Sequence, residues 1–343
     1  MNAQNRLPLL DGLRLFAAIS VVLYHLQLSN DGHGMFCRGY LFVDFFFLLS
    51  GFVLTLAAEH RMNASGGALR FLRARIARLW PIIAIGALTG ALVRTIETGQ
   101  SVRVLLVQAL LLVPDFRHDG LIFPLNGPHW SMMLEVIANI AHVLVIRRLS
   151  DRMVLAVAAL GGIALATAII LFGSATFGPD ASNWWLGFAR IGFSYPLGVW
   201  LARRRKIAGP VRTPSSLVLP WSIALALPLT AIMVLPALPL GTAAGDGLVI
   251  LAVFPPLLWL AASATPPRAA GKWLGLAGLL SFPLYAVHLP ILEYVGGLHL
   301  GAAGPVIAIA TALVVAALVA QIPSLRAIRP LPRMGRRSLL RQP

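Results

Sequence analysis

Apolar residues fill most of this chain in long runs that are separated by short polar or basic segments. Ten of these runs approach the length of about 20 residues that a helix needs to cross the hydrocarbon core of a bilayer. The pattern therefore predicts an all-α fold, a polytopic integral membrane helical bundle with about ten transmembrane helices. The predicted spans are residues 12–28, 40–58, 77–93, 129–146, 153–173, 184–201, 216–235, 246–263, 273–295 and 304–321.

One further apolar segment, residues 102–113, is too short to cross about 30 Å of hydrocarbon. Basic residues decide its placement, because loops rich in Lys and Arg face the cytoplasm. If this segment spanned, the basic groups at 147–148 and 203–206 would face outward. We therefore predict a short interfacial or re-entrant helix within an outer-face segment, residues 94–128. Both termini are then cytoplasmic, and we expect a multi-pass membrane protein.

Composition supports the membrane assignment. Hydrophobic residues make up 58% of the chain, charged residues make up 12%, and the mean hydropathy is +0.81. Soluble domains have about 25% charged residues, so these values argue against a water-soluble fold. We expect one transmembrane domain, residues 1–323, followed by a basic cytoplasmic tail, residues 324–343, that is disordered.

The formal net charge of +16 raises the question of nucleic-acid binding. The arginines gather between the predicted spans and in the tail, and no basic stripe interleaved with aromatic residues is present. This distribution is typical of cytoplasmic loops that attract anionic lipid, so we expect contacts with membrane lipid and none with nucleic acid. Cys37 is the only cysteine, which excludes an intrachain disulfide and a cysteine metal site, and we expect no metal.

Ionisable side chains inside apolar spans are costly and usually serve function. Asp11 and Arg14 lie at the mouth of the first span, and His25 lies well inside it. Arg14 and His25 are about three helical turns apart, so they share one helix face at a separation of about 16 Å. Arg75 and Arg78, spaced i,i+3 at the start of the third span, are suited to phosphate recognition; the alternative is that they only anchor the helix at the cytoplasmic face.

Three other spans carry polar groups at membrane depth. Ser131 and Glu135 share a face of the fourth span at i,i+4, and Tyr285 and His288 are i,i+3 neighbours on the ninth. A single buried histidine is more often a satisfied core residue than a catalyst. Polar groups in several spans together favour a functional site, although they do not specify its reaction. The further candidates on these spans are Asp44 and Trp130.

Five ordered elements stand out between residues 9 and 290. They are Leu10-Asp11-Gly12-Leu13-Arg14 with Val21-Val22-Leu23-Tyr24-His25; Val43-Asp44-Phe45-Phe46-Phe47-Leu48-Leu49-Ser50-Gly51-Phe52; Arg75-Ile76-Ala77-Arg78-Leu79-Trp80-Pro81; Trp130-Ser131-Met132-Met133-Leu134-Glu135; and Ser281-Phe282-Pro283-Leu284-Tyr285-Ala286-Val287-His288. Together they resemble the successive motifs of the membrane acyltransferase-3 family, integral membrane O-acyltransferases of the polysaccharide or lipopolysaccharide acetylase type. Because five elements occur in order, the match is far more specific than any single motif.

The resemblance implies ten spans with both ends cytoplasmic, which agrees with the charge pattern, and it implies a multi-pass protein of the bacterial inner (plasma) membrane. It implies an O-acyltransferase, usually an O-acetyltransferase, that moves an acyl group from cytoplasmic acyl-CoA (acetyl-CoA) to a hydroxyl of an envelope or exported glycan or glycolipid. Carried over residue by residue, it makes His25 the essential histidine and Glu135 a second catalytic candidate. Arg14, Arg75 and Arg78 are then expected to bind the donor.

This sequence departs from the family pattern in two respects. Met132 and Met133 replace a commoner Leu-Ser pair, and the usual acidic-aromatic continuation after Glu135 is missing, which bears on the role of Glu135. No C-terminal hydrolase-like domain is expected. Transfer is therefore expected to finish within the membrane domain or to pass the acyl group to partner enzymes of polysaccharide biosynthesis.

We expect His25 to act as a general base on the acceptor hydroxyl, a role suited to a group that titrates near neutral pH. A covalent acyl-histidine is the alternative mechanism. Glu135 and Asp44 are both candidates for orienting the imidazole. The alternative function is a membrane transporter or flippase that uses buried His, Glu and Arg for proton or substrate binding, although the sequence has no inverted repeat. An assembly subunit without chemistry is the third class.

Overall fold

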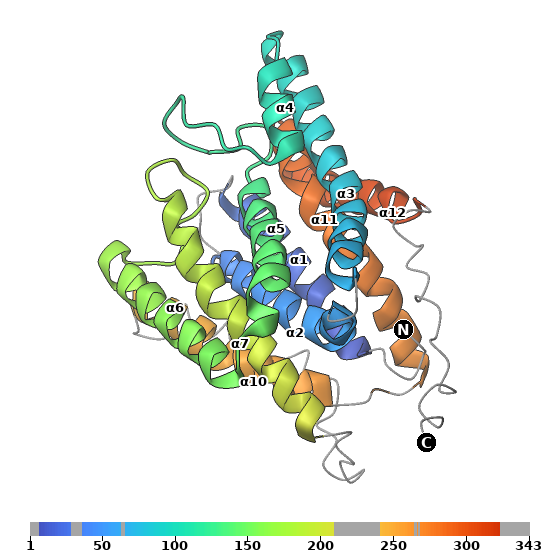
Figure 1. Ribbon diagram of the computed structural model, residues 1–343. Helices are drawn as coiled ribbons and strands as arrows, with labels where there is room; N and C mark the ends of the chain where they lie inside the picture. Colours follow the sequence, from blue (N-terminus) through green and yellow to red (C-terminus); the bar gives the residue numbers. More distant parts are fainter. Residues whose placement is uncertain are drawn as a thin grey trace, which may run out of the picture.

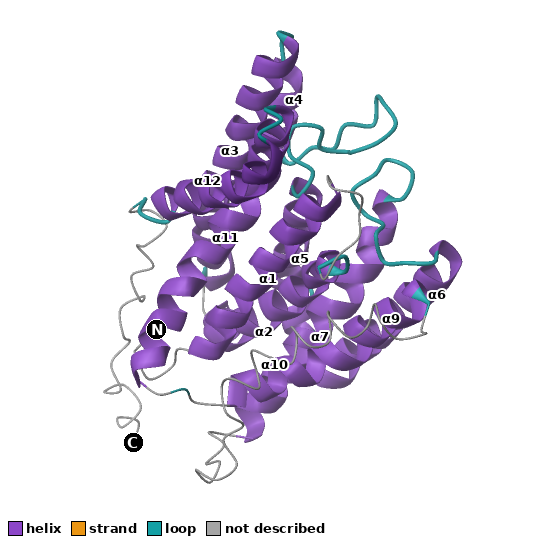
Figure 2. Cartoon of the chain, turned by 180° about the vertical axis from the view of Figure 1, so that it is seen from behind, coloured by secondary structure: helices purple, strands orange, loops and turns teal. Residues whose placement is uncertain are grey.

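The computed structural model describes residues 7–28, 36–62, 66–208, 241–263, 266 and 268–322, which form α-helices and no β-strand (Figures 1 and 2). A π-helical turn, Val249–Val253, joins two of the helices into one segment. The helices are α1 (Pro8–Leu28), α2 (Phe42–Met62), α3 (Gly67–Thr98), α4 (Arg103–Leu111), α5 (His129–Leu144), α6 (Asp151–Phe172), α7 (Gly187–Ala208), α9 (Thr242–Leu248), α10 (Phe254–Ser263), α11 (Arg268–Gly297) and α12 (Gly304–Val319).

Eight of the described helical segments are long and apolar enough to cross a membrane. They coincide with eight of the ten predicted spans, and the predicted polytopic helical bundle is confirmed. The predicted span 184–201 forms α7, which is 22 residues long but more polar than those eight, because it carries Arg190 internally and a basic group, residues 203–206, near its end. The predicted span 216–235 and the predicted tail, residues 324–343, lie outside the described residues.

The two ends of the bundle differ in character. We call the end where α1, α3 and α11 begin and α5 and α7 end the basic end, since most of the arginines among the described residues lie there. At the opposite end, the α4 end, α3 and α4 project together at the top of Figure 1, and the long loops gather beside them in Figure 2. The loop before α5 is joined to the loop before α7 by backbone hydrogen bonds, Ile122 to Pro179 at 2.9 Å and Ala181 to Gly120 at 2.8 Å.

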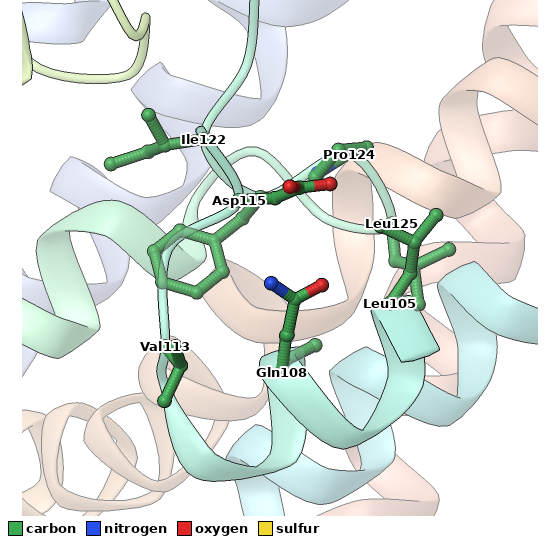
Figure 3. Close-up of a pocket in the computed structure, with 9 residues that line it drawn as sticks. Leu105, Gln108, Val113, Asp115, Ile122, Pro124 and Leu125 are labelled. Atoms are coloured by element: carbon green, nitrogen blue, oxygen red, sulfur yellow. The ribbon is translucent and has the colours of Figure 1, made fainter. Parts of the chain in front are cut away.

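The short predicted helix is α4, whose nine residues are too few to cross a bilayer. It lies against α3, where the Nε1 of Trp80 donates a hydrogen bond to the Leu110 carbonyl at 3.2 Å. Between α4 and the following loop is a small pocket of about 10 Å³, room for one water molecule, beside Gln108 and Asp115 (Figure 3). Hydrogen bonds from Arg117 hold the pKa of the Asp115 carboxyl below its usual value and fix this loop.

Burial separates central helices from peripheral ones. In the most apolar stretch of α2, 72% of residues are buried, whereas the figure is 28% for both α6 and α12. On α6, Leu160 and Ile170 expose 68% and 74% of their surface. A protein in water would rarely leave so much contiguous apolar surface open, so among the described helices α6 and α12 carry the surface best suited to face lipid.

Small residues let α2 and α7 pack closely along the centre of the bundle. A Cβ placed on Gly51 of α2 would lie 2.2 Å from the carbonyl oxygen of Tyr195, and one on Gly198 of α7 would lie 2.0 Å from that of Leu48. Both distances are far below van der Waals contact, so only glycine fits. Such close approach replaces the hydrophobic driving force that helices in lipid lack.

We expect Gly198→Ala to lower stability by about 1 to 3 kcal/mol, because the added methyl group forces α2 and α7 apart. Gly192→Ala on the same helix is the matched control, since apart from the neighbouring backbone of α7 itself no atom lies within 4 Å of a Cβ at that position. Thermal unfolding of the detergent-purified proteins measures both. A Gly198→Ala protein as stable as the Gly192→Ala control would show that this contact is not needed.

Candidate active site

α1 carries the first three candidates and lies parallel to α11. Near the basic end, Arg14 forms an ion pair with Asp11 at 3.6 Å. Gly278 of α11 makes room for this pair, because a Cβ there would lie 2.7 Å from the Cβ of Asp11. Near the α4 end, the ring of His25 on α1 packs against the ring of His288 on α11. The two helices are therefore in contact along the whole stretch from Arg14 to His25.

The rings around His25 come from three helices. The centroids of His25 and His288 are 5.2 Å apart at an interplanar angle of 42°, and Tyr24 packs on His25 at 5.1 Å. Tyr285 lies 5.8 Å from His288 on α11 and 5.4 Å from Phe46 of α2. The structure thus brings together the first and last motifs of the sequence, which are more than 250 residues apart.

Ser131 of α5 joins this cluster through a hydrogen bond of 2.6 Å with the Tyr285 hydroxyl. The Ser131 hydroxyl also donates to the Pro128 carbonyl at 2.9 Å. Because a carbonyl only accepts and serine has one proton, the Tyr285 hydroxyl must be the donor to Ser131. Tyr285 is thereby held with its lone pairs available to a ligand.

A proline fixes the neighbouring contact between the loop before α5 and α11. Pro290 has no N–H, so the Ala286 carbonyl one turn earlier has no intrahelical donor. The side-chain amide of Asn126 donates to that carbonyl at 2.7 Å. Gly86 of α3 allows this approach, because a Cβ there would lie 2.6 Å from the Ala286 oxygen. The Ala286 carbonyl, which lacks an intrahelical donor, thus holds Asn126 and with it the segment just before α5.

One turn along α5 from Ser131, Glu135 accepts a hydrogen bond from Arg75 at 2.5 Å and one from the Ser50 hydroxyl at 2.9 Å. The side chains of Arg75 and Glu135 keep 20% and 18% of their surface accessible. The buried Nε of Arg75 makes no hydrogen bond to a described residue. One donor of this guanidinium is therefore unused among the described residues.

Arg14, Arg75 and Arg78 form one electrostatic cluster. Arg14 interacts with Arg75, Glu135 and Asp11, and Arg78 interacts with all four. Three guanidinium groups and two carboxylates leave one positive charge in excess. Such a cluster suits an anionic ligand, because planar guanidinium groups bind phosphate oxygens through paired hydrogen bonds.

Asp44 and Trp130 lie in a separate network that sequence reasoning did not resolve. Arg190 of α7, which is 1% exposed, donates to Asp44 at 2.6 and 3.0 Å and lies 5.3 Å from the ring centre of Trp130. It also donates to the carbonyls of Tyr40 and Phe177. The neighbouring residues Trp130 and Ser131 thus point to different partners, one to a structural ion pair and the other to the histidine cluster.

Two further ion-pair networks were not predicted. At the α4 end, Asp246 accepts from Tyr40 at 2.6 Å and from Arg38 at 3.3 Å. At the basic end, Glu59 accepts from Arg203 at 2.5 and 3.0 Å, with His142 at 3.7 Å. Arg190 and Asp246 could have been singled out in the sequence, because ionisable groups in apolar spans usually have partners. Nothing local in the sequence identifies those partners.

A larger cavity of about 290 Å³ opens between α3, α11 and the loop before α5, and charged residues line it. They are Arg94, Glu97 and Glu293. Neither this cavity nor the pocket in Figure 3 includes His25 or Arg75. Among the described residues, no group of three or more His, Cys, Asp or Glu side chains could hold a metal ion.

Comparison with known proteins identifies the family. A family model described as an acyltransferase domain matches residues 7–324. The chain is 36% identical over 85 residues to the O-acetyltransferase OatA of Staphylococcus aureus (strain NCTC 8325 / PS 47), covering 24% of this chain and 13% of that protein. It is 32% identical over 145 residues to the acyltransferase MdmB of Streptomyces mycarofaciens, covering 38% and 36%.

A third relative is "Protein 2 in picA locus" of Rhizobium radiobacter, which is 33% identical over 158 residues, covering 39% of this chain and 79% of that protein. The matched regions therefore span only 13% of OatA and 36% of MdmB. No solved structure matches the chain. Because the family match extends from residue 7 to residue 324, nearly the whole chain, this protein belongs to the membrane acyltransferase-3 family.

Proposed function

We propose that this protein is a membrane O-acyltransferase that moves an acyl group, in the first instance acetyl, from cytoplasmic acyl-CoA to a hydroxyl of an envelope or exported glycan. The observation that carries the proposal is the arrangement of the motif residues. A positively charged arginine cluster lies toward the basic end, and a histidine and tyrosine cluster lies toward the α4 end of the same helices. The names of the two relatives, an O-acetyltransferase and an acyltransferase, support the same class of reaction.

On the donor side, Arg14, Arg75 and Arg78 bind the phosphates of acyl-CoA. The one excess positive charge and the unused Nε of Arg75 favour an anion at this position. The basic end faces the cytoplasm in this proposal, because the positive-inside rule places its arginines there. The flexible thioester arm then has to extend about 16 Å along α1 to reach His25.

On the acceptor side, the neutral imidazole of His25 removes the proton of the acceptor hydroxyl. The hydroxyl oxygen attacks the thioester carbon, the carbon–sulfur bond breaks, and the imidazolium returns the proton to the departing thiolate of CoA. General base catalysis of this kind contributes about 10² to 10⁴ in rate. Because the proton of the reacting hydroxyl goes to His25, Tyr285, whose own proton is directed to Ser131, would accept a hydrogen bond from a second hydroxyl of the acceptor glycan.

Glu135 fits a role in the donor site better than one on the histidine. It accepts hydrogen bonds from Arg75 and Ser50, and both hold it among the arginines. A carboxylate there fixes the guanidinium geometry, and it offsets part of the repulsion among three cations before the phosphates arrive. We therefore propose Glu135 as the group that orients Arg75.

The direct test is transfer by the purified protein in nanodiscs, with radiolabelled acetyl-CoA and a glycan fraction from the native envelope. Label that moves into the glycan supports the proposal. Comparison of envelope glycans by mass spectrometry, with and without the gene, should show the loss of an acetyl-sized increment. Absence of both signals would rule the proposal out.

A transporter or flippase remains the alternative class, and the charge pairing argues against it. A proton relay needs a carboxylate that can exchange protons. The buried carboxylates Asp44, Glu59 and Asp246 each form an ion pair with an arginine. Fixed pairs of this kind serve structure. Proton-driven substrate uptake by proteoliposomes without acyl-CoA would favour the transporter instead.

For the donor site, we expect Arg78→Ala to raise the KM for acetyl-CoA about 10-fold or more, because a hydrogen bond to a charged group contributes roughly 1.5 to 3 kcal/mol. The KM for acetyl-pantetheine, which lacks the nucleotide phosphates, should stay unchanged. Steady-state kinetics with both donors give the comparison.

Arg73→Ala is the matched control, since Arg73 is an exposed arginine on the same helix. An equal rise in KM in this control would show that Arg78 does not bind the donor specifically, and it would favour the alternative that these arginines only anchor the helix at the cytoplasmic face. A rise with acetyl-pantetheine would show that the effect of Arg78 is not on the phosphates.

A further inference from the structure

The contacts of His288 fix the orientation of its ring and the nitrogen that carries its proton. Its side chain is fully buried, and its Nδ1 lies 2.8 Å from the Tyr285 carbonyl oxygen on its own helix. A carbonyl oxygen only accepts hydrogen bonds, so Nδ1 must carry the proton. With the ring neutral and Nδ1 protonated, the other nitrogen, Nε2, carries a lone pair.

That lone pair makes no hydrogen bond within the described residues. Buried polar atoms without a partner are rare in folded proteins, so a donor for this nitrogen is expected nearby. The rings packed on His288 are those of His25 and Tyr285. The hydroxyl proton of Tyr285 is directed to Ser131, so of these two rings only His25 can offer a proton to Nε2.

The two carboxylates considered for orienting His25 have other partners. Glu135 is held by Arg75 and Ser50, and Asp44 by Arg190. By contrast, the ring of His288 lies 5.2 Å from that of His25, close enough for ring nitrogens to reach hydrogen-bond distance. Histidine function commonly depends on the group that holds its second nitrogen, because that group sets which nitrogen is basic.

We propose that His288 is the positioning residue of His25: its Nε2 accepts the N–H of His25 and leaves the other nitrogen of His25 basic toward the acceptor hydroxyl. The chain runs from the His25 N–H to the His288 Nε2, and from the His288 Nδ1–H to the Tyr285 carbonyl. When His25 takes the hydroxyl proton, this hydrogen bond supports the imidazolium until the proton passes to the thiolate. The inference rests on the acyl transfer proposed above.

Two variants separate this role from a structural one. His288→Gln keeps an acceptor oxygen near the position of Nε2, whereas His288→Asn keeps a donor near Nδ1 for the Tyr285 carbonyl and has no acceptor near Nε2. We expect the Asn variant to lower kcat about 10²-fold at unchanged KM for acetyl-CoA, and the Gln variant to stay within about 10-fold of the wild type. If His288 were only structural, the Asn variant would be the more active of the two.

The second measurement is a double-variant cycle with His25→Ala, with rates normalised to the folded fraction from size-exclusion chromatography. Since His288 acts through His25, adding His288→Asn to His25→Ala should cause no further loss. A further loss in the double variant, or equal activity of the Gln and Asn variants, would overturn the inference. Wild-type protein without acyl transfer would instead refute the proposed function, so the two failures are distinguishable.

Discussion

His25→Ala is expected to lower the rate of acyl transfer by a factor of about 10² to 10⁴, because it removes the group that takes the acceptor proton. Binding of acetyl-CoA should persist, since the arginine cluster lies about 16 Å away along α1. The measurement is transfer of labelled acetyl groups by the purified variant, together with the Kd for acetyl-CoA from calorimetry.

His60→Ala serves as the control, since His60 is an exposed histidine at the end of α2. Its turnover should match that of the wild type. Near-normal turnover in His25→Ala would remove the general base from the mechanism. Loss of acetyl-CoA binding in the same variant would show instead that His25 belongs to the donor site.

The second large effect is expected at the Asp44–Arg190 pair and concerns stability. Arg190→Ala should lower the free energy of unfolding by about 3 to 5 kcal/mol, because it leaves a buried carboxylate without its counter-ion. Replacing both members by apolar residues, Asp44→Leu with Arg190→Met, should cost less than either single change. Titration of the detergent-purified proteins with a denaturing surfactant measures the free energy of unfolding of all these variants.

Arg117→Ala is the comparison for a pair with an exposed cation, because the side chain of Arg117 is 52% exposed although that of Asp115 is only 3% exposed. Solvent screens the Arg117 charge, and Asp115 keeps its hydrogen bond from the backbone N–H of residue 117, so the loss of stability should be smaller than at Arg190. If the Arg190→Ala protein were as stable as the Arg117→Ala protein, the buried pair would contribute little to the stability of the fold.

Most of the helices could be predicted from the sequence, because apolar runs of membrane length are typical of transmembrane helices and rare in soluble folds. The largest difference is at α3, predicted as 77–93 and observed as Gly67–Thr98. Its first turns carry Arg70, Arg73 and Arg75, which end the apolar run but not the helix. Hydropathy marks the part of a helix that lies in hydrocarbon, whereas backbone hydrogen bonds continue beyond it into polar surroundings.

The candidate site was predictable in its members but not in its pairings. Helical spacing placed Arg14 and His25 on one face and paired Arg75 with Arg78 and Tyr285 with His288, and the motif resemblance then assigned roles to some of these residues. The partners Glu135 of Arg75 and His288 of His25 lie 60 and more than 250 residues away in sequence, so no local periodicity can reveal them. Arg190 was not singled out, because it stands alone in its predicted span.

The sidedness of the reaction offers the sharpest test. Proteoliposomes that contain the protein in one orientation would be loaded with acceptor glycan on the side of the α4 end and supplied with labelled acetyl-CoA on one side at a time. We predict that label enters the glycan only when acetyl-CoA is on the side of the arginine cluster. Transfer that requires donor and acceptor on the same side of the membrane would contradict a path from Arg14 to His25.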